Sequence, residues 1–150
     1  MGHRIEVDQS NKIEDSGSTV IAFANGIGDA VLTPSSVKGQ AIHWLRRNHT
    51  LQAPAHVLDF AAAVFLLLEP HLDQLDKVVI DVEYTGYNRR IKDFLLTRIW
   101  RNHPGFEAWR IEFGQVGKGP AHDKANLVRE GKDRERRTVR LQELLNVLQK

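Results

Sequence analysis

The chain of 150 residues contains no cysteine, so disulfide bonds, thiolate metal sites and a cysteine nucleophile are excluded. A bound metal ion would have to be held by oxygen or imidazole, which favours magnesium, manganese or calcium over zinc. The longest apolar run, residues 60–68, is far shorter than the roughly 20 residues of a membrane span. The N-terminus also lacks an apolar signal region. We therefore expect a soluble cytoplasmic protein with no membrane partner.

Several catalytic motifs are missing as well. Two glycine-bearing stretches, residues 25–29 and 114–119, lack the Gly-Lys-Ser/Thr ending of a phosphate-binding loop, which argues against nucleotide hydrolysis. The seven histidines form no His-x-x-x-His pair, and there is no Gly-x-Ser-x-Gly elbow.

Net charge is only +2, from 21 basic and 19 acidic residues, yet the basic residues cluster locally. Three clusters stand out, at residues 46–47, 89–92 and 134–140. Each one alone is compatible with a solvated helix face. Together they favour a polyanionic partner, and we expect nucleic acid.

The apolar pattern predicts one domain, residues 1–150, because its length suits a single core and no linker interrupts it. Short alternating or β-branched runs predict strands, and longer amphipathic or apolar runs predict helices. The expected strands span residues 4–8, 19–24, 28–33, 78–81 and 109–113, and the expected helices 35–48, 54–69, 91–101, 121–130 and 138–149.

This order predicts an α/β fold with a mixed five-stranded sheet and helices on both faces. The first three strands would form an antiparallel meander, and the last two would run parallel to the first through right-handed crossovers. If the fourth strand lies beside the first, Asp8 and Asp81 become neighbours that repel unless a cation sits between them. Glu83 falls on the same face as Asp81 but further out, as an auxiliary ligand.

The element order and the position of these acids resemble the ribonuclease H-like superfamily, which includes ribonuclease H, Holliday-junction resolvases and transposases. Ile5-Glu-Val-Asp-Gln-Ser10 resembles its first strand and Val78-Val-Ile-Asp81 its fourth. The stretch from Asp59 to Glu69 is similar to its acid-bearing helix, although the family usually has Glu there. Residues 117–125 correspond to the start of its last helix, where His122 or Asp123 would act and spacing favours His122.

The resemblance implies a two-metal nuclease acting on RNA, an RNA–DNA hybrid or branched DNA with Mg²⁺ or Mn²⁺. Asp8, Asp59, Asp81 and His122 would be catalytic, and Asp123 and Glu83 would join Asp8, Asp59 and Asp81 as candidate metal ligands. Phosphates would be contacted by Lys118, Lys124, Arg89 and Arg90. The helix around Trp44 departs from the minimal family pattern and leaves the substrate class open.

Each candidate also has a structural interpretation. Asp8 and Asp81 could be ordinary turn or cap residues, and Asp59 could simply favour a helix N-terminus. His122 could be no more than a partner for the first turn of its helix. The alternative function is a non-catalytic nucleic-acid-binding or protein-interaction module on the same fold, and the sequence leaves the oligomeric state open.

Overall fold

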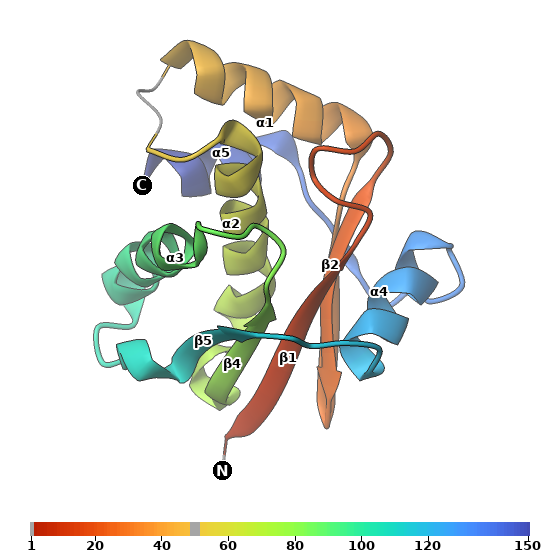
Figure 1. Ribbon diagram of the computed structural model, residues 1–150, viewed down its shortest axis with the longest axis vertical. Helices are drawn as coiled ribbons and strands as arrows, with labels where there is room; N and C mark the ends of the chain where they lie inside the picture. The colour runs from red at the N-terminus through yellow and green to blue at the C-terminus, as the bar shows by residue number, and fades with distance from the viewer. Residues whose placement is uncertain (1, 49–51) are drawn as a thin grey trace.

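The computed structural model describes residues 2–48 and 52–150, which form an α/β fold around a six-stranded mixed sheet (Figure 1). In chain order the elements are β1 (His3–Ser10), β2 (Thr19–Asn25), β3 (Ile27–Thr33), α1 (Ser35–Asn48), α2 (Ala55–Leu68), the 3-10 helix η1 (Glu69–Gln74), β4 (Leu75–Asp81), α3 (Asn88–Asn102), the 3-10 helix η2 (Ala108–Arg110), β5 (Ile111–Gly114), α4 (Pro120–Arg129), β6 (Arg137–Thr138) and α5 (Leu141–Gln149).

The strand order is β5-β4-β1-β2-β3-β6. Strands β1, β2 and β3 form an antiparallel meander, β4 runs parallel to β1, and β5 runs parallel to β4. The predicted arrangement of these five strands is therefore confirmed. It places the carboxyl ends of β1 and β4 side by side, where open sheets of this kind tend to carry their sites.

The sequence predicted five strands, and this number was wrong. The sheet of the described residues has a sixth strand, the two-residue β6, which pairs in parallel with β3. The sequence predicted a helix from residue 138, whereas α5 begins at Leu141. A two-residue exposed strand carries no alternation to detect. A side chain helps to hold it: the Arg137 guanidinium donates to Asp29 Oδ2 at 2.9 Å and to the Leu66 carbonyl at 2.9 Å.

The helices cover the two faces of the sheet unequally. Four of them, α1, α2, α3 and α5, contribute to one large hydrophobic core against one face. Among the described helices, α4 packs on the other face, over a small cluster formed by Val20, Ala22, Ala30, Ala125 and Val128. Figure 1 shows this division, with α4 on the opposite side of the sheet from α2 and α3.

Helix α2 is the centre of the large core. Its alanines Ala61, Ala62 and Ala63 are fully buried, and such small side chains permit close approach of neighbouring elements. With η1 it forms a 20-residue helical stretch, Ala55–Gln74, that is long and apolar enough to cross a membrane by length and composition alone. However, 67% of its most apolar window is buried inside the fold, and a core helix meets the same criterion.

Candidate metal centre

Three carboxylates converge where β1 and β4 end. The register pairs Val7 with Ile80, which places the next residues, Asp8 and Asp81, at adjacent positions on parallel strands. Glu83 follows Asp81 by two residues and joins them. One oxygen atom from each of these three side chains lies within 4.8 Å of the others. The prediction that Asp8 and Asp81 would be neighbours is confirmed.

Alternation along β1 decides which face carries the cluster. Ile5 and Val7 point into the large core, so Asp8 and Ser10 point to the opposite face, which α4 covers. Asp8 is 6% exposed, whereas Asp81 and Glu83 are half-buried. The cluster is therefore shielded on the β1 side and open beyond β4.

Backbone amides orient two of the acids. The Gln9 amide donates to Asp8 Oδ1 at 2.8 Å, and the Val116 amide donates to Asp81 Oδ1 at 2.9 Å. Val116 lies in the loop from β5 to α4, which runs past the carboxyl end of β4 through its contact with Asp81 and across β1 to α4 in the view of Figure 1. Each carboxylate oxygen has two lone pairs, so these bonds leave acceptor capacity for a cation.

The three carboxyl groups are close enough to affect the pKa of Glu83. Burial raises this pKa to about 8, with further increases from the hydrogen bond to Asp81 and from the negative charges of Asp81 and Asp8. The side chain of Gln9 acts in the opposite direction. Like charges held this close favour a proton or a cation between them. The three acids could hold a metal ion, and an all-oxygen set suits a hard cation.

His122 lies beside the cluster, as the sequence predicted. Of the three acids, its ring contacts Asp8. His122 is on the first turn of α4, and its Nδ1 is 3.2 Å from Asp8 Oδ2. Its other ring nitrogen, Nε2, is 3.1 Å from Asn126 Nδ2. Asp123, the alternative to His122, is exposed and does not belong to the acid cluster.

The structure does not bring Asp59 to the cluster. Asp59 is fully buried on α2, on the other side of the sheet, with the Lys38 ammonium as the charge that acts on it. Neither of its carboxylate oxygens has a hydrogen-bond partner within the described residues. Burial raises its pKa to about 7, and Lys38 opposes the increase. The resemblance of residues 59–69 to the acid-bearing helix of the family therefore singled out a buried acid. Its charge partner Lys38 is on α1, away from the strand ends.

Lys38 is the counterpart of Asp59 and is itself 3% exposed. Its ammonium donates to the Asp15 carbonyl at 2.7 Å and to Thr19 Oγ1 at 3.0 Å, which anchors the loop between β1 and β2. Burial lowers its pKa, while the charges of Asp59, Asp15 and Glu14 oppose that decrease. This pair belongs to the packing of α1 and α2.

The four predicted phosphate contacts divide into two groups. Lys124 forms ion pairs within the chain, because its ammonium is 2.8 Å from Asp133 Oδ2 and 3.4 Å from Glu135 Oε1. Lys118 is exposed on the loop from β5 to α4. Arg89 and Arg90 are exposed in the first turn of α3. Lys118, Arg89 and Arg90 are thus the available cations of this set.

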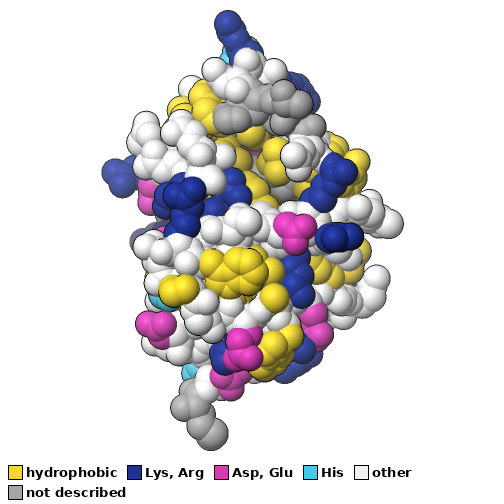
Figure 2. All heavy atoms as spheres, turned by 90° about the vertical axis from the view of Figure 1, so that its left-hand side faces the viewer, with side chains coloured by type: hydrophobic (Ala, Val, Ile, Leu, Met, Phe, Trp, Pro, Cys, Tyr) yellow, Lys and Arg dark blue, Asp and Glu magenta, His cyan; other side chains and the backbone are white. Residues whose placement is uncertain are grey.

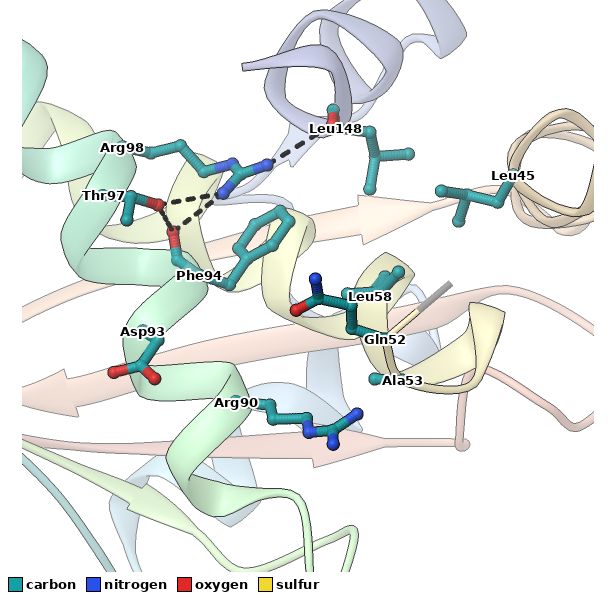
Figure 3. A pocket seen from close by; sticks show the side chains of 10 residues that line it. All are labelled: Leu45, Gln52, Ala53, Leu58, Arg90, Asp93, Phe94, Thr97, Arg98 and Leu148. Carbon is teal, nitrogen blue, oxygen red and sulfur yellow. Dashed lines mark hydrogen bonds between the residues drawn. The ribbon is translucent and has the colours of Figure 1, made fainter. Parts of the chain in front are cut away.

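Arg90 borders two adjoining cavities. One, of about 690 Å³, lies at the start of α3 and is lined by Gln52, Gly86, Arg89, Arg90 and Asp93. The other, of about 350 Å³, lies among α1, α2, α3 and α5, with the side chains shown in Figure 3. There the guanidinium of Arg98 stacks 3.4 Å from the Phe94 ring centroid and donates to the Leu148 carbonyl. Arg98 is therefore structural, whereas Arg90 faces open space.

The surface around α3 carries more positive than negative side chains across its middle. Figure 2 shows this side of the molecule, where Lys and Arg side chains gather in the middle and Asp and Glu side chains lie mostly below them. Apolar side chains also show on this face, in several groups (Figure 2). The gathering of positive side chains suits a polyanion.

Three polar residues that the sequence did not single out also belong to the site. Asn126 Oδ1 accepts from Ser10 Oγ at 2.6 Å, and Ser10 Oγ accepts from Arg129 Nε at 2.6 Å. The sequence spacing could have shown which of these residues share a face. Positions 122, 126 and 129 lie on one face of α4, and positions 8 and 10 lie on one face of β1. Only the packing of α4 on β1 shows that the two faces meet.

Comparisons with protein-family models, with curated proteins and with solved structures gave no match.

Proposed function

We propose that this protein is a metal-dependent nuclease with a ribonuclease H-like fold, which hydrolyses phosphodiester bonds in RNA, an RNA–DNA hybrid or branched DNA. The observation that carries the proposal is the convergence of Asp8, Asp81 and Glu83 within 4.8 Å at the carboxyl ends of two adjacent parallel strands. The strand order supports it, because a three-strand meander extended by two parallel strands resembles that superfamily.

The donor set favours Mg²⁺ or Mn²⁺ as the cofactor. Asp8, Asp81 and Glu83 would hold the ions through carboxylate oxygens, in a chain that has no thiolate to offer a softer metal. When bound, the ions would supply the Lewis-acid chemistry of two-metal phosphodiester hydrolysis. Glu83 would be a full member of the site, in the place that the resemblance had given to Asp59.

The cations near the strand ends would bind the nucleic-acid backbone. Lys118 lies on the loop that also donates to Asp81, so it is close in the chain to the acid cluster. Arg129 is exposed and uses its Nε to reach Ser10, two residues beyond Asp8. Arg89 and Arg90 line the larger cavity at the start of α3. Together they would hold phosphates on more than one side of the cluster.

A substrate panel tests the proposal. Hybrid, duplex RNA, single strands and a four-way junction are incubated with and without Mn²⁺, using the wild type, Asp81→Asn and the control Asp73→Asn. Asp73 is a suitable control because its side chain is 92% exposed and pairs with His103, remote in the fold from the cluster. We expect Mn²⁺-dependent cleavage of at least one substrate, lost by about 100-fold or more in Asp81→Asn and unchanged in the control.

Cleavage that persists in Asp81→Asn would remove the acid cluster from the mechanism. Salt-sensitive binding of nucleic acid with no cleavage of any substrate would instead favour the non-catalytic binding module.

A further inference from the structure

A chain of polar contacts runs from the surface of α4 to the acid cluster. It starts at Arg129, passes through Ser10, Asn126 and His122, and ends on Asp8. The four distances are 2.6, 2.6, 3.1 and 3.2 Å in that order. Ser10, the second residue of this chain of contacts, is 5% exposed, and Asp8 at its end is 6% exposed.

The donor and acceptor capacities give the chain a direction. Arg129 can only donate, so Ser10 Oγ accepts from it and uses its own hydrogen towards Asn126 Oδ1. The amide group of Asn126 then presents its Nδ2 hydrogens to His122 Nε2, which must be the acceptor of the ring. In a neutral ring the proton therefore sits on Nδ1, which faces the Asp8 carboxylate.

We propose that His122 is a positioning residue for Asp8: Asn126 holds the ring so that Nδ1–H donates to Asp8, and His122 does not itself ligate the metal. This role rests on the proposed function, because it concerns how Asp8 is presented to a cation. Both ring nitrogens are engaged, one by Asp8 and one by Asn126, which leaves no lone pair for an ion.

The consequence for Asp8 is a carboxylate fixed from both sides. The Gln9 amide holds Oδ1 at 2.8 Å, and His122 holds Oδ2 at 3.2 Å. Asp81 accepts from the Val116 amide on Oδ1, and its other partner is Glu83, another acid of the cluster. Outer-shell partners of this kind orient a ligand and commonly change metal affinity by about 10- to 100-fold when removed. Asn126 should therefore affect metal binding without touching the metal.

The first experiment uses the metal-free protein, so its result does not depend on metal binding. Long-range ¹H–¹⁵N correlation spectra of the His122 ring are recorded at a pH where the ring is neutral, for the wild type, Asn126→Leu and the control Asn102→Leu. Asn102 is exposed at the end of α3. We expect the Nδ1–H tautomer in the wild type and the control, and a mixture with the Nε2–H form in Asn126→Leu. An Nε2–H ring in the wild type, or no change in Asn126→Leu, would overturn the proposal.

The second experiment adds Mn²⁺. Calorimetric titration should show about 10- to 100-fold weaker binding to Asn126→Leu than to the wild type, with the control within about 2-fold. Electron spin-echo modulation of the Mn²⁺-loaded wild type should show no directly coordinated imidazole nitrogen; a coordinated nitrogen that is lost in His122→Ala would overturn the positioning role. Absence of Mn²⁺ binding to the wild type would overturn the proposed function, even if the tautomer is as expected, so the two failures are distinguishable.

Discussion

Asp59 and Glu83 lie on opposite faces of the sheet, and burial is the main cause of the raised pKa of both, but their charged neighbours differ. Asp59 lies in the large core, where burial raises its pKa and the Lys38 charge opposes the increase. Glu83 is half-buried at the strand ends, and the neighbouring carboxylates Asp81 and Asp8 add to the effect of burial. A raised pKa therefore does not identify a functional acid by itself; the convergence of several acids does.

The largest expected effect is on stability and concerns Asp59→Asn. The folded pKa of Asp59, about 7, lies above its ordinary value of 3.8, so the folded state holds this proton more tightly. The stabilisation is complete below pH 4 and is lost as pH rises from 4 to 7. Asn has no proton to lose, so above pH 7 the variant should be more stable than the wild type by up to about 4 kcal/mol.

Urea denaturation between pH 4 and 8.5 measures this difference, with Asp73→Asn as the exposed control. If the difference in unfolding free energy between Asp59→Asn and the wild type does not change with pH, the pKa of Asp59 is not raised by burial.

A smaller effect is expected for Glu83→Gln, which removes the other acid of the comparison. Because Glu83 contributes one of the three oxygens of the cluster, Mn²⁺ affinity should decrease by about 10-fold. Above pH 8, where Glu83 is ionised, the melting temperature of the metal-free variant should not decrease, because a repulsive charge is removed. Calorimetry and thermal melting check both, with the exposed Glu112→Gln as control. An unchanged Mn²⁺ affinity would mean that Glu83 is not a ligand and that Asp8 and Asp81 form the metal centre without it.

The smallest effect is expected for the double variant of Arg89→Gln and Arg90→Gln. These two arginines lie on the large-core side of the sheet, so any phosphates that they bind would link the two faces. Nucleic-acid affinity should decrease a few-fold, and the slope of log K against log salt should decrease by about 1 to 2. Arg46→Gln with Arg47→Gln, at the exposed end of α1, is the matched control. An equal change in both pairs would indicate nonspecific attraction.

Local pattern was sufficient to predict the part of the fold that places the acids. The apolar run 78–80 ends abruptly on Asp81, and the sequence predicted that Asp8 and Asp81 meet if β4 lies beside β1, which the structure shows. The period of two then predicts that Glu83 shares the face of Asp81. These inferences hold because strand alternation and chain order are local properties.

Contacts between elements were harder to predict. Asp59 lies on a helix that is buried nearly all round, so its sequence gives no indication of which face meets the strand ends. Asn126 and Ser10 are 116 residues apart in the chain, and only the packing of α4 on β1 makes them partners. Strand β6 is likewise defined by pairing with β3 and not by its own two residues.

Mn²⁺ titration of the metal-free protein by calorimetry, comparing the wild type with Asp81→Asn, tests the central claim most directly. The account predicts saturable binding to the wild type, with a rise in melting temperature on loading, and binding to Asp81→Asn that is weaker by about 100-fold or more. Equal binding to both proteins, or no binding to the wild type, would contradict a metal centre formed by Asp8, Asp81 and Glu83.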